Sequence, residues 1–225
     1  MSETEGIHVD VWSDIACPWC YIGKRRLETA IEELSGDAGV PPVSVTYHSF
    51  ELQPELTGEA EVDQVTHLAE KYGLDAERAR RAIDGVADVA RSVGLDYDMS
   101  SVRMTNTVRA HQLIHLAAEH GLQEPMKERL LAAYFVEGRH LGRVDELADL
   151  AEEVGIDRDE AIAALERDRY LDAVRADQRQ AAAYGIRGVP FYVIDGRYGV
   201  SGAQEPATFV QALRTVAAER AGGPA

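Results

Sequence analysis

The stretch Cys17-Pro18-Trp19-Cys20 decides how this chain is interpreted, because it contains the only two cysteines in the sequence. The residues before it, 7–13, alternate and are rich in β-branched side chains, which predicts a strand. The residues after it, 21–35, have the spacing of a helix. The two thiols therefore lie at a strand-to-helix junction, where the helix N-terminus favours a thiolate over a thiol.

The spacing of the two cysteines suits a dithiol that exchanges disulfides. Such a site needs one thiol that ionises near neutral pH and a second thiol that resolves a mixed disulfide. We expect Cys17 at or just before the first helical turn, where unpaired backbone N–H groups stabilise negative charge. Cys20 is expected one turn inside and more buried, which makes Cys17 the predicted nucleophile and Cys20 the resolving thiol. Pro18 suits the first helical position, and we expect Pro18 and Trp19 to contribute to a substrate-binding surface.

Two other interpretations of the cysteine pair are a zinc half-site and a pair of inert buried thiols. A zinc site needs two more ligands, and the sequence has no second cysteine pair. His111 and His115 have i, i+4 spacing on a predicted helix, but they are much farther from Cys20 than in small zinc modules. A helix with a polar stripe explains the two histidines better, because the glutamate of the HExxH motif is missing. We therefore expect no metal, and the strand-loop-helix context disfavours inert thiols.

Composition limits the class of protein. The chain has 225 residues, which suits one large domain or a smaller domain with an insertion. A net charge of -16 argues against nucleic acid and anionic membranes as partners, because both require a basic face. The acidic, polar start lacks the features of a secretory signal, and no apolar run is long enough for a membrane helix. We therefore expect a cytoplasmic protein, in a compartment where thiols are kept reduced.

The periodicity of the chain changes twice. The first part reads as a β-α-β unit with parallel strands, and the last part, after Gly185, reads as β-β-α with a hairpin turn at Asp195-Gly196. Between them, from about 62 to 184, the spacing of apolar residues is helical almost throughout. The strands and helices expected in the two ends are 7–13, 20–35, 43–48, 191–194, 198–200 and 206–220.

A second informative element is Gly188-Val189-Pro190-Phe191, which precedes one of the expected strands. A proline is tolerated at the start of a strand, and an X-Pro bond is the usual place for a cis peptide. Beside a dithiol, a cis proline would leave the backbone of Val189 free to pair with an extended peptide or a cofactor, and would keep metal from the thiols. The alternative is a trans proline that only begins the strand, and Val-Pro by itself favours that alternative.

Taken together, these motifs resemble the DsbA-like branch of the thioredoxin superfamily, and within it the FrnE-like and 2-hydroxychromene-2-carboxylate isomerase group. The stretches that carry the resemblance are 13–24 (SDIACPWCYIGK), 185–193 (GIRGVPFYV) and 200–204 (VSGAQ). The resemblance implies an α/β thioredoxin fold with a mixed central sheet and a large inserted all-helical domain. Residues 1–60 and 185–225 would form the discontinuous thioredoxin-like domain, and residues 61–184 the insertion.

The resemblance also implies roles for single residues. Cys17 matches the attacking thiolate, Cys20 the resolving thiol, and Pro190 the cis-proline of the family. Val189 matches the residue whose backbone binds substrate. Asn106 resembles a polar position near the active-site groove, with a helix N-cap as the equal alternative.

Two smaller features near the motif have open interpretations. Asp14 either tunes the thiols through its charge or shapes the loop. The basic run Lys24-Arg25-Arg26 either attracts an acidic partner, glutathione included, or forms a solvated face offset by Glu28.

The function that the resemblance implies is a thiol–disulfide oxidoreductase of the DsbA/FrnE type. A glutathione-dependent isomerase or transferase in aromatic or polyketide metabolism is the alternative, and a non-enzymatic chaperone is a second one. The isomerase and kappa-class glutathione transferase branches carry a serine at the nucleophile position, whereas this chain has Cys17, which favours disulfide exchange. We expect no tightly bound cofactor, with glutathione as a candidate co-substrate. The expected partner is a protein or small molecule with a thiol or disulfide, and a monomer and a homodimer both remain open.

Overall fold

The sheet at the centre of the molecule is built from strands that come from both ends of the chain. The computed structural model describes residues 6–56 and 64–222. Within them, the sheet has the strand order β2-β1-β3-β4. The bounds are β1 (Ile7–Ser13), β2 (Val43–Ser49), β3 (Phe191–Ile194) and β4 (Tyr198–Ser201). β1 pairs in parallel with β2 and antiparallel with β3, and β3 pairs antiparallel with β4, so the sheet is mixed.

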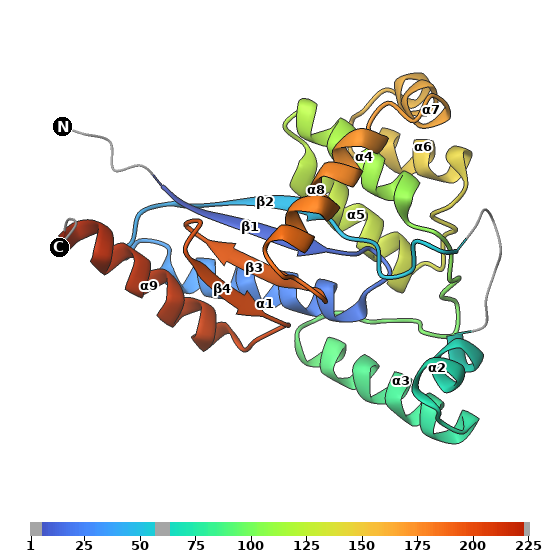
Figure 1. Ribbon diagram of the computed structural model, residues 1–225, viewed down its shortest axis with the longest axis horizontal. Helices are drawn as coiled ribbons and strands as arrows, with labels where there is room; N and C mark the ends of the chain where they lie inside the picture. Colours follow the sequence, from blue (N-terminus) through green and yellow to red (C-terminus); the bar gives the residue numbers. More distant parts are fainter. Residues whose placement is uncertain (1–5, 57–63, 223–225) are drawn as a thin grey trace.

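Two long helices pack on one face of this sheet. α1 (Pro18–Leu34) connects the parallel strands β1 and β2, and α9 (Pro206–Gly222) follows β4. α1 and α9 contact each other beside the sheet (Figure 1). Val11 of β1, Leu27 of α1 and Phe209 of α9 belong to one buried cluster. Burial of such apolar surface is the main stabilising contribution to a fold of this kind.

The opposite face of the sheet contacts α8 (Leu171–Ala183). Successive side chains of a strand point to opposite faces, so Trp12 points away from the side on which Val11 lies. Trp12 belongs to a separate buried cluster with Ala181 of α8 and with Ile186. Its indole Nε1 also donates a hydrogen bond of 3.1 Å to the backbone oxygen of Asp177. β1 is therefore buried on both faces.

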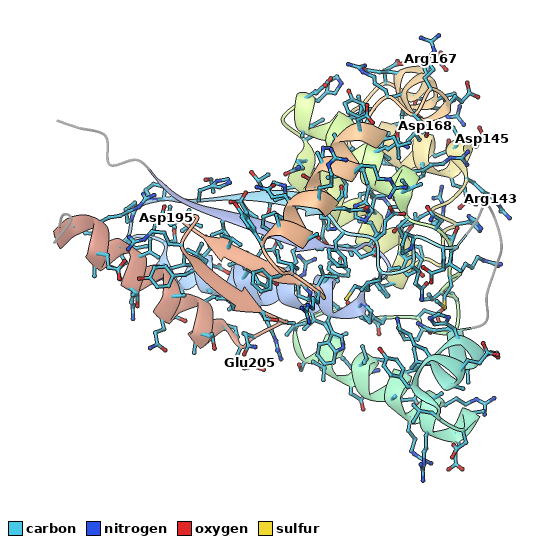
Figure 2. The ribbon with its side chains drawn as sticks, viewed as in Figure 1. Arg143, Asp145, Arg167, Asp168, Asp195 and Glu205 are labelled. Atoms are coloured by element: carbon cyan, nitrogen blue, oxygen red, sulfur yellow. The ribbon has the colours of Figure 1, made fainter. Side chains whose placement is uncertain are left out.

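The other helices form, with α8, an insertion between β2 and β3. They are α2 (Gln64–Tyr72), α3 (Ala76–Ser92), α4 (Val108–Glu119), α5 (Gln123–Phe135), α6 (Val144–Glu153) and α7 (Arg158–Glu166). Figure 1 shows α4 to α7 as one group at the end of the sheet, and α2 with α3 as a separate pair near the start of α1. Exposed charges of both signs, such as Arg143, Asp145 and Arg167, project from the outside of the larger group (Figure 2).

The predicted fold class and the order of elements are confirmed, and the insertion is helical. One expectation was too broad, because residues 93–107 between α3 and α4 are not helical. The division into residues 1–60 with 185–225 and residues 61–184 stays a prediction, and its first boundary falls outside the described residues. In the described part of the chain, we find no helix with the length and apolar character needed to cross a membrane.

Candidate active site

Cys17 lies at the junction of β1 and α1, as the sequence predicts. It is the N-cap residue of α1, with extended backbone angles (φ -93°, ψ 111°), and Pro18 takes the first helical position. The Cys17 side chain makes no capping hydrogen bond, and the first turn contains no acidic residue. The positive end of the helix dipole is therefore directed at the sulfur without a competing carboxylate in that turn.

The two motifs that are far apart in the sequence meet at this sulfur. The Cys17 Sγ donates a hydrogen bond of 3.6 Å to the backbone oxygen of Val189. The peptide bond between Val189 and Pro190 is cis, as the resemblance implies. The structure thus brings the loop before β3 directly beside the nucleophile that we predict.

The two thiols differ in their electrostatic surroundings more than in their exposure. Cys17 is 4% exposed and Cys20 is 3% exposed, so the expected difference in burial is negligible. Burial and the neighbouring Cys17 thiol raise the pKa of Cys20 well above its usual value, against an opposing charge from Lys127. Cys20 therefore holds its proton in the resting state, which suits a resolving thiol. Both cysteines are free thiols in the structure.

A cavity opens beside Cys17, between the start of α1 and the α2–α3 pair. Its volume is about 370 Å³ and most of its lining is apolar. The wall on the cysteine side includes Cys17, Pro18, Trp19, Gly188 and Val189. The wall on the helical side includes Leu68, Lys71, Tyr72, Ile83, Val86, Met99 and Met104. Four of the residues predicted at the site, Pro18, Trp19, Val189 and Cys17, thus lie around one cavity.

The non-helical segment 93–107 explains how this cavity is built. Met99 and Met104 come from it and line the cavity. Tyr97 from the same segment donates a hydrogen bond of 2.8 Å from its hydroxyl to the backbone oxygen of Pro18. Its ring also stacks on Phe135 of α5, with centroids 4.7 Å apart. The segment therefore fixes the start of α1 against the insertion, which a continuous helix would not do.

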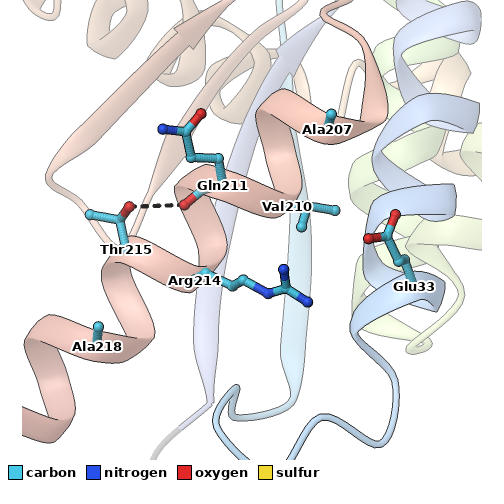
Figure 3. Close-up of a pocket in the computed structure, with 7 residues that line it drawn as sticks. All are labelled: Glu33, Ala207, Val210, Gln211, Arg214, Thr215 and Ala218. Carbon is cyan, nitrogen blue, oxygen red and sulfur yellow. Dashed lines mark hydrogen bonds between the residues drawn. The ribbon is translucent and has the colours of Figure 1, made fainter.

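A second cavity, between α1 and α9, lies far from the thiols. Its volume is about 470 Å³, and its lining includes Glu33 on α1 and Arg214 on α9 (Figure 3). Glu33 is near the C-terminal end of α1, about 24 Å along the helix axis from Cys17 at the other end. The cavity beside Cys17 is therefore the one that we interpret as the substrate site.

Asn106 lies at the start of α4. Its Oδ1 accepts a hydrogen bond of 2.9 Å from the backbone N–H of Val108, and its Nδ2 donates one of 3.3 Å to Glu51. Thr107 is the N-cap residue of α4, so Asn106 caps the helix from one position earlier. Asn106 is not among the described residues that line the cavity, so its role in substrate binding stays a prediction.

Asp14 shapes the loop between β1 and α1. Its Oδ2 accepts a hydrogen bond of 2.8 Å from the backbone N–H of Leu52, and its Oδ1 lies 3.2 Å from Nε2 of His111. Burial opposes ionisation of this carboxyl, but the hydrogen bonds from His111 and Leu52 hold its pKa below the usual value. Asp14 is thus a buried carboxylate that ties the active-site loop to α4 and to the chain after β2.

The two histidines that have metal-ligand spacing are each held by a different carboxylate. His111 contacts Asp14, whereas Nε2 of His115 lies 3.1 Å from Asp177 on α8. Across residues 6–56 and 64–222, no three His, Cys, Asp or Glu side chains are grouped in a way that would hold a metal ion. The histidines thus connect α4 to its neighbours.

Of the two interpretations of the basic run, the solvated face is wrong for Lys24, whereas the offset by Glu28 is confirmed. Lys24 is only 4% exposed, because α5 covers it. Its Nζ lies 2.9 Å from Glu128 of α5 and also contacts Glu28. Glu128 follows this run by more than a hundred residues in the sequence, so helical spacing within α1 does not reveal it as a partner.

A buried lysine, Lys127 of α5, is the functional candidate that sequence reasoning missed. It is 1% exposed, and its Nζ has no hydrogen-bond partner in the structure. Burial lowers the pKa of Lys127 to about 8, against the opposing effects of Cys20, Asp14 and Cys17. A signal was present: Lys127 lies at helical spacing from the buried Leu130 and Leu131, on the apolar side of α5.

The family follows from comparison with known proteins. The model of the DSBA-like thioredoxin domain family matches residues 8–214, and the chain belongs to this family. The crystal structure of a probable DsbA oxidoreductase from Streptomyces coelicolor is similar, with 38% identity, a TM-score of 0.87, and coverage of 97% of this chain and 92% of that chain. The uncharacterized protein YwbO of Bacillus subtilis is 29% identical over 213 residues, which cover 92% of this chain and 96% of the relative.

A more distant likeness concerns the fold alone. The cytosolic disulfide reductase DsbM from Pseudomonas aeruginosa, solved with GSH, has a TM-score of 0.65 at 18% identity, over 94% of this chain and 100% of that chain.

Proposed function

We propose that this protein is a thiol–disulfide oxidoreductase in which Cys17 is the nucleophile and Cys20 resolves the mixed disulfide. The observation that carries the proposal is the position of Cys17. Its sulfur lies at the N-terminus of α1, in the wall of a cavity and 3.6 Å from the Val189 oxygen. Cys20 lies one helical turn further on. Membership in the DSBA-like family supports the same chemistry.

The reaction follows from these positions. The Cys17 thiolate attacks one sulfur of a substrate disulfide, and the other sulfur leaves as a thiolate that takes a proton from water. Cys20 then gives up its proton and attacks the Cys17 Sγ, which forms the Cys17–Cys20 disulfide and releases the second substrate thiol. Two electrons pass from the protein dithiol to the substrate disulfide. The same steps in reverse oxidise a substrate dithiol.

The cavity points to the kind of substrate that we propose. Its mostly apolar lining and the half-exposed ring of Trp19 fit a disulfide that has an apolar neighbouring group, on a protein or on a small molecule. We propose that the backbone of Val189 pairs with this group when it is an extended peptide. Lys71 in the cavity wall adds one positive charge for a substrate carboxylate.

Glutathione is the thiol that we propose as co-substrate, in a cytoplasmic setting where the resting form is the dithiol. Its carboxylates would meet Lys71, and its cysteine would exchange with Cys17. The fold likeness to DsbM, which was solved with GSH, is consistent with this proposal.

The test is an insulin reduction assay on three proteins: wild type, Cys17→Ser and Cys20→Ser. We expect Cys17→Ser to lose the activity, and Cys20→Ser to accumulate a mixed disulfide at Cys17 that mass spectrometry detects. Undiminished activity of Cys17→Ser would contradict the proposal. A glutathione-dependent isomerisation that survives in Cys20→Ser would instead favour the isomerase alternative. Holdase activity that persists in a variant with both Cys17→Ser and Cys20→Ser would favour a chaperone.

The reduction potential of the Cys17–Cys20 pair gives the direction of electron flow. A value close to that of thioredoxin, about -270 mV, marks a reductase, and a value close to that of DsbA, about -120 mV, marks an oxidase. Equilibration of the protein with glutathione buffers of known ratio measures it.

A further inference from the structure

We propose that Lys127, on a helix of the insertion, is the internal proton acceptor that activates Cys20 for the resolving step. This inference rests on the proposed function, because it concerns the second half of the same exchange. It gives the helical insertion a chemical role in addition to its role as a wall of the cavity.

The position of Lys127 is fixed first from the side of the sheet. The side-chain amide of Gln123, at the start of α5, pairs with the backbone of Tyr47 in β2: its Oε1 accepts from the N–H and its Nε2 donates to the oxygen, both at 3.0 Å. Lys127 follows one turn later on the same side of α5. Its Nζ lies 5.7 Å from the centroid of the Tyr47 ring. Lys127 therefore points between α5 and the sheet.

Contacts made by α1 also locate Lys127. Cys20 and Lys24 are one turn apart on the same side of α1. The Lys24 Nζ lies 2.9 Å from Glu128, the residue that follows Lys127. This ion pair brings the turn of α5 that contains Lys127 beside the part of α1 that contains Cys20 and Lys24. After burial, Cys20 has the largest effect of any ionisable group on the pKa of Lys127, which places the two side chains close together.

The two buried lysines of this interface differ in what surrounds their charge. Lys24 is paired with carboxylates, Glu28 and Glu128. Lys127 has no hydrogen-bond partner at its Nζ and faces an aromatic ring. An unpaired ammonium in the interior is costly, so stability alone does not account for Lys127. Burial lowers the pKa of Lys127 to about 8, which gives an amine that gains and loses a proton near neutral pH.

The groups that face Lys127 from the surrounding elements are Cys17 and Cys20 at the start of α1, Lys24 within α1, Asp14 in the loop after β1, and Tyr47 in β2. Asp14 is the other conceivable acceptor, but its oxygens already accept from Leu52 and His111 and its pKa is lowered, so it is a weak base. Burial raises the pKa of Tyr47 well above its usual value, so Tyr47 stays neutral. Burial also raises the pKa values of Tyr97 and Tyr192, the hydroxyls on which Cys20 acts, so they stay neutral as well. Of these groups, Lys127 is the one whose lowered pKa suits it to accept the thiol proton.

The step balances as a proton transfer followed by disulfide exchange. In the mixed disulfide, the proton of the Cys20 thiol moves to the neutral amine of Lys127, which becomes an ammonium. The Cys20 thiolate attacks the Cys17 Sγ, the Cys17–Cys20 bond forms, and the bond to the substrate sulfur breaks. The substrate leaves as a thiolate with the electron pair, and the proton on Lys127 returns to solvent or to that thiolate.

The test is a stopped-flow reaction of the reduced protein with dithiobis(nitrobenzoate), which releases a coloured thiolate twice. The first release reports attack by Cys17, and the second reports closure by Cys20. In the wild type we expect the rate of the second release to rise with pH around a midpoint near 8, the value to which burial lowers the pKa of Lys127. In Lys127→Met we expect that rate at pH 7 to fall by at least about tenfold and its midpoint to move up by about one unit or more, because Cys20 must then ionise without help.

Two further variants separate proton transfer from charge and from packing. Lys127→Arg restores the positive charge but does not give up a proton in this range, so we expect the slow second release to persist. Lys24→Arg changes the packing of the paired lysine of the same interface but keeps its charge, so it is expected to leave the midpoint of the second release unchanged. Circular dichroism of each variant confirms that the measured species is folded.

The possible outcomes distinguish this inference from the proposed function. A wild-type protein that shows no second release has no Cys17–Cys20 exchange, which would overturn the proposed function. A normal second release that has the same midpoint and rate in Lys127→Met would overturn the inference alone. Full recovery in Lys127→Arg would also overturn it, because the charge would then suffice.

Discussion

Two clusters of ionisable side chains hold the helical insertion against the rest of the molecule, and they are built in opposite ways. The first, which we call the paired cluster, consists of Asp10, His48, His115 and Asp177 and fastens α8 and α4 to the sheet. The second, the cysteine site, consists of Cys17, Cys20 and Lys127 and joins α1 to α5. In the paired cluster every charge has a partner of opposite sign. In the cysteine site the lysine has none.

In the paired cluster, each ionisable side chain has a partner from another side chain of the cluster. His48 lies between Asp10, at 2.7 Å, and Asp177, at 3.0 Å. Asp177 also accepts a hydrogen bond of 2.8 Å from the backbone N–H of Ser49. The Trp12 ring stacks on His48 with centroids 4.5 Å apart. Such a network holds its charges fixed and stabilises the position of α8.

The difference between the paired cluster and the cysteine site distinguishes a structural charge from a reactive one. Pairing with carboxylates raises the pKa of His48 away from neutral pH, to about 9, whereas burial without a partner lowers the pKa of Lys127 toward neutral pH, to about 8.

Removal of Asp177 should cause the largest loss of stability. In Asp177→Ala, His48 and His115 lose their shared carboxylate inside the protein, so we expect the free energy of unfolding to fall by about 3–5 kcal/mol. Urea denaturation of the reduced protein measures it. Asp149→Ala is the matched control, because it removes the half-exposed partner of Arg158 and should cost less than about 1 kcal/mol. Equal losses in the two variants would refute the contrast.

Stability should fall as the pH rises from about 6.5 to about 9. Burial alone would lower the pKa of His48, but hydrogen bonds to Asp10 and Asp177 raise it to about 9. Protonated His48 therefore stabilises the fold fully below about pH 6.5, the pKa of a histidine in the unfolded chain. This stabilisation is lost as the pH rises through about 9, and the free energy of unfolding falls by at most about 3 kcal/mol. Denaturation at several pH values should show this slope in the wild type, and a flatter profile in His48→Gln. Parallel profiles would contradict the assignment.

Replacement of Lys127 by methionine should stabilise the protein. The variant removes an unpaired buried ammonium, so we expect the free energy of unfolding at pH 7 to rise by about 2 kcal/mol. The pKa of Lys127 is lowered to about 8 in the folded state. The penalty is therefore complete below pH 8, and the advantage of the variant should shrink as the pH rises toward about 10.4, the unfolded value. A destabilised variant would mean that Lys127 has a structural role.

The smallest effect is expected for Tyr192, whose buried hydroxyl has no hydrogen-bond partner in the structure. Its ring packs against Phe209, and its hydroxyl lies where a side chain on Gly23 would be. In Tyr192→Phe we expect a gain of about 1 kcal/mol, because an unsatisfied hydroxyl is removed while the ring stays. Thermal unfolding measures the gain, and a loss of stability would indicate a partner for the hydroxyl.

The sequence predicted the parts of the molecule that depend on local spacing. The strand before Cys17, the position of Pro18 in the helix and the hairpin after β3 all follow from patterns of a few residues. The approach of Val189 to Cys17 was expected only because both motifs resemble one family. The insertion was expected to be helical for two reasons: its apolar residues have helical spacing, and the family that the motifs resemble has a helical insertion.

The rest depends on contacts between distant segments. Helical spacing indicates the pairing of Lys24 with Glu28, but not the burial of Lys24, because its second carboxylate partner, Glu128, lies on α5. Lys127 was missed because its meaning depends on Cys20, which is far away in the sequence. Asp177 looks like an ordinary polar residue of α8 until His48 and Ser49 are placed beside it.

Disulfide exchange by Cys17 and Cys20 can be measured by equilibration of the protein with glutathione buffers, followed by mass spectrometry of the trapped thiols. We predict a reversible conversion between the dithiol and an intramolecular Cys17–Cys20 disulfide, with Cys20→Ser stopping at a glutathione mixed disulfide on Cys17. A protein that forms no Cys17–Cys20 disulfide at any buffer ratio would contradict the account.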